Sequence, residues 1–338
     1  MGNLQTQSAV VRPGSGRDQF MFVDGLRAVA ALAVATYHAM LFTGRTDSYK
    51  AELPDPVRLV LEQGHYGVAA FIVLSGFVLT LPLARGELAL RGGWRSYLGR
   101  RAWRILPPYY VALAIYTSLI IAIPALRTHQ DTAWDSKVPV TDGGLISHLL
   151  LVHNLQWEWQ GQIDGPMWSV ATEWQLYFLL PLLLLPLWRR AGLPRTVVLA
   201  VGIGVAIHYL LPSLDGAHFW FLGLFALGMA ASQATVTQMP TGRWLVGSAP
   251  VLVAMAALQS KLNLPTWLLE TTVGVVIALL VVRLAAEPRS VVRRALEWRG
   301  MVFVGLFSYS LYLIHSPLLG FGNLPCFLLS FPGPSSSP

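Results

Sequence analysis

Residues 22–42 read FVDGLRAVAALAVATYHAMLF, an almost unbroken apolar stretch. A helix needs about 20 mainly apolar residues to cross a bilayer, and this stretch is long enough. Further segments of the same kind follow at 66–84, 106–124, 167–188, 196–211, 218–235, 244–259, 267–285 and 302–321. The apolar patch at 145–155 is too short to span, so we expect a surface or re-entrant helix there. The sequence predicts an all-α membrane protein, a polytopic bundle of nine or ten transmembrane helices.

The composition leads to the same class. Hydrophobic residues make up 54% of the chain and charged residues 12%, and the mean hydropathy is +0.53. A soluble domain carries about 25% charged residues and cannot bury so much apolar surface. The single cysteine, Cys326, excludes an intrachain disulfide and a metal–thiolate cluster.

The distribution of arginine and lysine predicts the direction of the chain. The connections 85–104, 189–195 and 283–299 are rich in arginine, whereas 43–65 and 125–165 are acidic or nearly neutral. Basic residues concentrate in cytoplasmic loops, so we expect a cytoplasmic N-terminus and a location in a bacterial plasma membrane. Residues 1–20 lack the apolar core and cleavage site of a signal peptide, and we interpret them as a disordered cytoplasmic leader.

Ionisable residues at membrane depth cost several kcal/mol and are candidates for function. Arg27 and His38 are eleven residues apart, so they differ by only about 20° around the helix axis and lie about 16 Å apart along it. One helix face therefore carries a cation at its cytoplasmic end and an imidazole near its outer end. The alternative is that Arg27 extends to the cytoplasm beside Asp24, while His38 simply lies at an interface.

Two later segments also carry polar side chains on one face. Ser169 and Glu173 are one turn apart in 167–188. A buried carboxylate needs a partner, so we expect one for Glu173 in the bundle. Tyr312 and His315 share a face of 302–321 with Ser308. Catalysis and plain hydrogen bonding between helices both remain open for these residues.

Two motifs have a structural and a functional interpretation. In FIVLSGFVLT (71–80), Gly76 permits close helix approach and Ser75 permits a hydrogen bond across it, so packing is favoured. The run RRAWRILPPYY (100–110) partly reflects anchoring at the cytoplasmic interface. The connection 85–104 nevertheless holds more arginine than orientation requires, and phosphate binding is a second role.

Five segments together resemble acyltransferase family 3, a family of membrane O-acyltransferases. They are FVDGLRAVAALAVATYHA, FIVLSGFVLT, RRAWRILPPYY, WSVATEWQLYFLLP and FSYSLYLIHSP, in this order along residues 22–317. The matching residues are Arg27 and His38; Ser75, Gly76 and Phe77; Arg101, Arg104, Pro107 and Tyr109; Trp168, Ser169, Glu173 and Tyr177; and Ser308, Tyr309, Tyr312, His315 and Pro317.

The resemblance implies transfer of a short acyl group, with acetyl expected, from acyl-CoA to a hydroxyl of a carbohydrate or a glycosylated small molecule. It implies acyl-CoA as co-substrate, the lipid bilayer as surroundings, and neither a metal nor nucleic acid as partner. The acyltransferase domain would occupy 21–322. Residues 323–338 would form a short tail that is atypical, because members usually continue with a further helix. With no hydrolase-like domain following, the chain resembles a stand-alone member.

Within this resemblance, roles can be assigned to the candidate residues. Arg27, Arg101 and Arg104 would hold the phosphates of CoA, with Ser75 at the same donor site. His38 would act as general base, because imidazole titrates near neutral pH, and Glu173 would orient it. Ser169, Tyr312 or His315 would donate to the developing oxyanion. A carrier for a polar or anionic solute and an inactive scaffold are the alternatives, but neither explains the ordered five-segment match.

Overall fold

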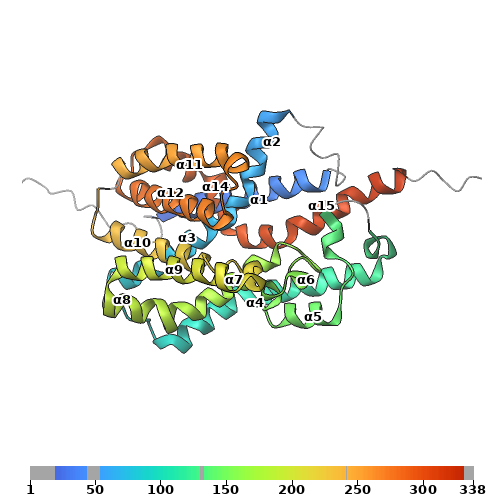
Figure 1. Cartoon of the computed structure of the whole chain (residues 1–338), viewed down its shortest axis with the longest axis horizontal. Helices are drawn as coiled ribbons and strands as arrows, with labels where there is room; N and C mark the ends of the chain where they lie inside the picture. The colour runs from blue at the N-terminus through green and yellow to red at the C-terminus, as the bar shows by residue number, and fades with distance from the viewer. Residues whose placement is uncertain (1–19, 44–53, 130–132, 241, 331–338) are drawn as a thin grey trace, which may run out of the picture.

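The computed structural model describes residues 20–43, 54–129, 133–240 and 242–330. In these residues it contains helices and turns but no strand (Figure 1), which confirms the all-α fold. The predicted leader, apart from Phe20, lies outside the described residues, as do residues 331–338 of the predicted tail.

The helices are α1 (Met21–Thr43), α2 (Asp55–Glu62), α3 (Gly67–Ala84), α4 (Gly93–Ala122), α5 (Asp142–Leu149), α6 (Trp157–Gln160), α7 (Met167–Leu179), α8 (Leu185–Ala191), α9 (Leu193–Leu210), α10 (Phe221–Val236), α11 (Gly242–Leu262), α12 (Thr266–Ala286), α13 (Val291–Leu296), α14 (Arg299–Leu306) and α15 (Ser308–Ser330). A π-helical turn at Leu180–Leu184 joins α7 to α8, and short 3-10 turns lie between several other helices.

In the part of the chain that the structure describes, six helical spans are long and apolar enough to cross a membrane. They are α1, the α2–α3 unit, α4, the α7–α8 unit, α9 and α12. A seventh arises if α14 and α15 form one span with a bend of 74°. The other two predicted spans correspond to α10, which is apolar but only 16 residues long, and to α11. The chain is an integral membrane protein.

Two predicted boundaries differ from those observed. Helix α4 begins at Gly93, so much of the arginine-rich connection predicted at 85–104 is helical. Long arginine side chains let such a turn extend past the apolar layer, because their charged ends reach water. Helix α15 was expected to end near residue 321 but continues to Ser330.

Glycine contacts hold α3 against α10 in the middle of the bundle. A Cβ atom at Gly76 would lie 2.2 Å from the Phe225 carbonyl oxygen, and one at Gly228 would lie 2.1 Å from the Val73 carbonyl oxygen. The two backbones therefore touch, as small residues allow in membrane helices. This contact confirms the packing role predicted for Gly76.

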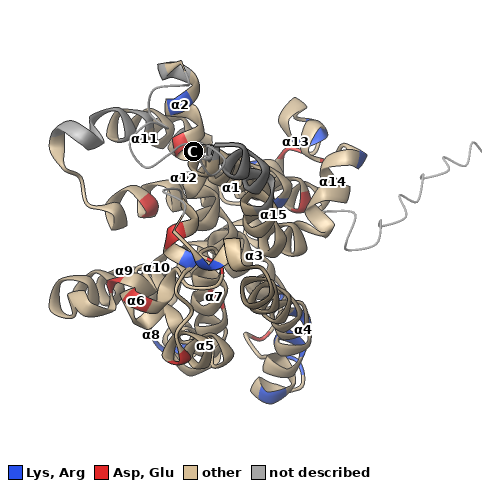
Figure 2. Cartoon of the chain, turned by 90° about the vertical axis from the view of Figure 1, so that its right-hand side faces the viewer, with Lys and Arg blue, Asp and Glu red and all other residues tan. Residues whose placement is uncertain are grey.

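The bundle has two chemically different ends. We call the end that carries the α3–α4 and α8–α9 connections the arginine end. The opposite end, formed by residues 123–129 and 133–166, which include α5 and α6, is the loop end; in Figure 1 it lies on the right. Figure 2, viewed from the loop end, shows that charged residues are sparse on most helices and gather on a few, among them α4.

Candidate active site

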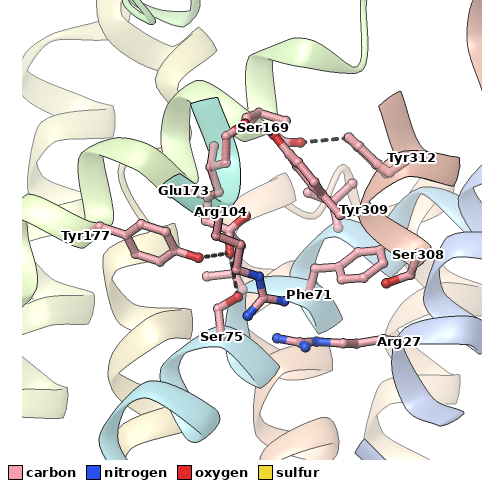
Figure 3. Close-up of a pocket in the computed structure, with 14 residues that line it drawn as sticks. Arg27, Phe71, Ser75, Arg104, Ser169, Glu173, Tyr177, Ser308, Tyr309 and Tyr312 are labelled. Carbon is pink, nitrogen blue, oxygen red and sulfur yellow. Dashed lines mark hydrogen bonds between the residues drawn. The ribbon is translucent and has the colours of Figure 1, made fainter. Parts of the chain in front are cut away.

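Glu173 on α7 is bound by hydroxyl groups from two helices. Its Oε1 accepts hydrogen bonds from Ser75 Oγ of α3 at 2.5 Å and from the Tyr177 hydroxyl at 2.6 Å (Figure 3). Such short bonds are typical of a hydroxyl donating to an ionised carboxylate. The partner that we expected for Glu173 in the bundle is thus provided by Ser75 and Tyr177. Glu173 was also expected to orient His38, but no hydrogen bond joins the two in the described residues.

Arg27 of α1 and Arg104 of α4 face each other near this carboxylate (Figure 3). Neither side chain makes a hydrogen bond or an ion pair with the described residues. The two positive charges repel each other. Of the two carboxylates that attract Arg27, Glu173 has a larger effect than Asp24. Two neighbouring guanidinium groups with free donors form a site for an anion, because each presents a planar fork of N–H groups.

A cavity of about 60 Å³ lies between these groups and continues to the inner end of the site. A second hollow of about 480 Å³ shares four of its lining residues, namely Arg27, Arg104, Ser308 and Tyr309. The second hollow is also lined by Phe20 and Leu81, which lie near the arginine end. Together the two hollows form a passage from the arginine end into the bundle, with the arginine pair where they meet.

The inner end of the passage is lined by Ser169 and Tyr312. The Ser169 Oγ and the Tyr312 hydroxyl are 2.7 Å apart, and both lie within hydrogen-bond distance of the Pro166 carbonyl oxygen, at 3.2 Å and 3.1 Å. Both side chains are buried. This hydroxyl pair is the polar group of the cavity farthest from the arginine end.

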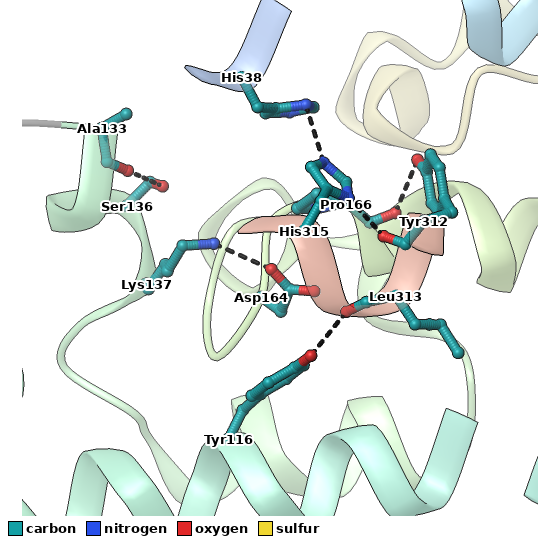
Figure 4. Close-up of polar contacts among 10 residues, drawn as sticks. All are labelled: His38, Tyr116, Ala133, Ser136, Lys137, Asp164, Pro166, Tyr312, Leu313 and His315. Atoms are coloured by element: carbon teal, nitrogen blue, oxygen red, sulfur yellow. Dashed lines mark hydrogen bonds and ion pairs between the residues drawn. The ribbon is translucent and has the colours of Figure 1, made fainter. Parts of the chain in front are cut away.

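His38 and His315 form a pair beside Tyr312 (Figure 4). The His315 Nε2 lies 3.1 Å from the His38 Nδ1. His315 Nδ1 is 2.7 Å from the Tyr312 carbonyl oxygen, and His38 Nδ1 is 2.9 Å from the Val34 carbonyl oxygen. Sequence reasoning had marked both histidines without pairing them.

These distances assign the protons of the two neutral rings. A carbonyl oxygen only accepts, so each Nδ1 must carry a proton. His315 Nε2 is then an acceptor, and it shares the proton on His38 Nδ1 with the Val34 carbonyl oxygen. The lone pair of His38 Nε2 has no protein partner among the described residues. The site thus contains an oriented imidazole with a free basic nitrogen.

His38, His315 and Arg101 line neither hollow. His315 lies beside Tyr312, which does line the cavity, and His38 contacts His315. The buried Nε of Arg101 has no hydrogen-bond partner in the described part of the chain. Three residues along a helix turn the side chain about 60° away from the direction of Arg104. A role for Arg101 in donor binding stays a prediction.

Sequence reasoning missed two polar groups at the loop end. Lys137 and Asp164 form a buried ion pair, with 3.0 Å between Nζ and Oδ1. His148 and His153 stack with their ring centres 3.7 Å apart, and burial lowers the pKa of His148 to about 4 and that of His153 to about 3. Both imidazoles are therefore neutral at pH 7. The only sign of the ion pair in the sequence was a lysine and an aspartate 27 residues apart in the same connection.

Comparisons with known proteins give one consistent family. The family model described as an acyltransferase domain matches residues 21–333. The acyltransferase MdmB of Streptomyces mycarofaciens is 26% identical over 330 residues, covering 89% of this chain and 79% of that protein. The O-acetyltransferase OatA of Staphylococcus aureus is 23% identical over 334 residues, covering 89% of this chain and 51% of OatA. The peptidoglycan O-acetyltransferase OatA of Listeria monocytogenes is 21% identical over 326 residues, covering 88% and 49%.

The chain thus spans about half the length of the two OatA proteins. No solved structure matches it. The family model covers all five sequence motifs and every residue of the cavity described above. The chain belongs to acyltransferase family 3, a family of membrane enzymes that transfer acyl groups.

Proposed function

We propose that this protein transfers a short acyl group, acetyl in the simplest case, from acyl-CoA to a hydroxyl of a carbohydrate or a glycosylated small molecule. The observation that carries the proposal is the passage itself. It begins at the arginine end, passes the free guanidinium groups of Arg27 and Arg104, and ends at Ser169 and Tyr312 beside the His38–His315 pair.

The arginine pair suits a phosphorylated donor. CoA carries its charge on phosphates at one end and its thioester at the end of a long neutral arm. Arg27 and Arg104 would bind phosphate oxygens through charge-assisted hydrogen bonds. The neutral arm would then extend into the inner cavity, where Phe71 and Ile72 add apolar surface beside Ser75.

The histidine pair suits the chemical step. His38 Nε2 would take the proton of the acceptor hydroxyl as its oxygen attacks the thioester carbonyl. The positive charge that develops on His38 would be shared with His315 through the Nδ1–Nε2 contact. The carbon–sulfur bond then breaks, the acyl–oxygen bond remains, and the proton on His38 passes to the leaving thiolate to give free CoA.

The hydroxyl pair at the inner end suits the oxyanion. Ser169 and Tyr312 are close enough for either hydroxyl to donate to the other or to a bound oxygen. A donor aimed at the oxygen that becomes charged contributes about 3–4 kcal/mol to transition-state stabilisation. Glu173 would hold Ser75 and Tyr177 in place at the donor side.

The acceptor would be reached from the loop end. The O-acetyltransferase relatives named above, one of which acts on peptidoglycan, support a carbohydrate acceptor. We assign the arginine end to the cytoplasm of a bacterial cell, where acyl-CoA is made, and the N-terminus with it. This orientation is supported by the positive-inside distribution of arginine.

The proposal is tested with purified protein in nanodiscs, supplied with acetyl-CoA and a panel of glycans and glycosylated metabolites. Appearance of free CoA together with an acetylated acceptor is the expected result, with His38→Ala as the inactive control. A carrier would bind or move solute without releasing thiol. Wild-type protein that releases no CoA with any acceptor in the panel, and none with water, would exclude the proposed reaction.

A further inference from the structure

A buried ion pair lies next to the histidine pair and has no role in the proposed mechanism so far. Lys137 lies in the 3-10 turn Ala133–Lys137 and Asp164 lies just before α7. Their side chains are 2% and 0% exposed. Figure 4 shows this pair immediately beside His315, with His38 beyond it.

The hydrogen-bonding capacity of this ion pair is only partly used by the residues around it. The second carboxylate oxygen of Asp164, Oδ2, is buried and has no hydrogen-bond partner among the described residues. The Lys137 Nζ lies 5.8 Å from the ring centres of Phe42 and of Trp134. Burying two charges costs several kcal/mol per ion, and an apolar pair of the same volume is often as stable. Stability alone therefore does not explain why these charges are here.

A purely structural role is the competing explanation. The two segments are already joined through the backbone, because Ile163 N donates to the Lys137 carbonyl oxygen at 3.0 Å. Gln162 also binds the neighbouring segment, through its side-chain oxygen to the Thr141 amide at 3.0 Å. The segments that carry Lys137 and Asp164 are thus connected by hydrogen bonds even without the ion pair.

The neighbours of the pair are titratable groups from several elements. His315 of α15 is acted on by both charges and His38 of α1 by Lys137. His148 of α5 also interacts with both. From α4, Tyr109 and Tyr116 interact with Asp164, and Tyr312 of α15 does the same. The tyrosine hydroxyls are neutral donors in hydrogen bonds, so the histidines are the groups nearby that can gain a charge at working pH.

We propose that Asp164 is a positioning residue for the acyl-transfer step, supplying the countercharge when the His38–His315 pair takes up the acceptor's proton, and that Lys137 holds Asp164 ionised and in place. The proposal rests on the proposed function. It explains the unpartnered Oδ2, because a carboxylate with a free lone pair stabilises a nearby imidazolium. It also explains the lysine, since a lone buried carboxylate would take up a proton itself.

The charge of Asp164 predicts a shift in the pH profile, which a structural connection does not. The acid limb of kcat/KM against pH reports protonation of the base in the free enzyme. Asp164→Asn removes the anion, so the limb should move to lower pH by about one pH unit, the size expected for the interaction of two partly buried charges. Lys137→Met leaves a lone buried carboxylate, which takes up a proton, so the anion is lost here too and the limb should again move to lower pH. Lys137→Arg keeps the cation and should leave the limb near its wild-type position.

Asp215→Asn is the matched control. Asp215 Oδ1 lies 2.5 Å from His208 Nδ1, so the variant also removes a carboxylate beside a histidine. Its charge is not among those acting on His38 or His315. The control should leave the acid limb where it is in the wild type.

A reversed pair keeps the test decisive if a single variant does not fold. Lys137→Asp combined with Asp164→Lys retains an ion pair but places the cation nearer His315, so the limb should move to lower pH. Limbs that stay in place in Asp164→Asn and in Lys137→Met would overturn the inference. Wild-type protein that releases no CoA would instead overturn the proposed function, so the two failures are distinguishable.

Discussion

Replacing Arg104 tests donor binding more directly than any other change. Arg104 lines both hollows and makes no hydrogen bond or ion pair with the described residues, so Arg104→Ala breaks no such bond within them. A hydrogen bond to a charged group contributes about 1.5–3 kcal/mol. Because the Arg104 side chain is partly open to solvent, the lower value applies. We expect the KM for acyl-CoA to rise about tenfold, since 1.4 kcal/mol is a factor of ten, with little change for the acceptor.

Arg100→Ala is the matched control for this prediction. Arg100 lies four residues away on α4, donates to Ser96 Oγ and lines neither hollow. Steady-state release of CoA, measured on variants with verified membrane insertion, gives both KM values. Arg104→Lys should recover part of the affinity, because lysine keeps the charge and loses the planar fork. An unchanged donor KM in Arg104→Ala, or an equal rise in Arg100→Ala, would show that this arginine does not bind the donor specifically.

Three further predictions address the base, the packing and the orientation. His38→Ala should abolish acyl transfer while thermal stability in detergent stays near that of the wild type; normal turnover would remove His38 from the mechanism. Gly228→Val should lower the melting temperature strongly, because its Cβ would lie 2.1 Å from a carbonyl oxygen of α3, whereas Gly202→Ala, with open space around its Cβ, should not. Cysteines placed at Ser96 and Ser136 in a cysteine-free background should react with an impermeant reagent in intact cells only at 136; reaction at 96 would reverse the orientation.

The sequence was a good guide to most features that depend on local periodicity. The apolar runs predicted the helices, because the length of a span is set by bilayer thickness. The small-residue signal predicted the contact made by Gly76. The predicted start of α4 was wrong, because a search for apolar residues alone assigns an arginine-rich terminal turn to a loop.

Contacts between distant segments could not be predicted in the same way. His38 and His315 meet across 277 residues, and Ser75 and Glu173 across 98. Both contacts depend on how the helices rotate against one another and on the 74° bend that precedes α15. The partner assigned to Glu173 was therefore His38 rather than Ser75. Lys137 and Asp164 lie in turns that have no periodicity. Charged residues in such turns are usually solvated, so a buried pair could not be expected from the sequence.

Ser75 and Gly76 are neighbours on α3 that lie about 100° apart around the helix axis, and their two contacts limit how the enzyme can diversify. Ser75 borders the cavity, while the backbone at Gly76 is in contact with α10. Helix α3 therefore cannot retreat to admit a bulkier donor without losing that contact. A lineage that acquired longer acyl chains would have to make room by trimming side chains such as Phe71, so acyl-chain preference should be transferable between relatives by exchanging a few residues on an unchanged scaffold.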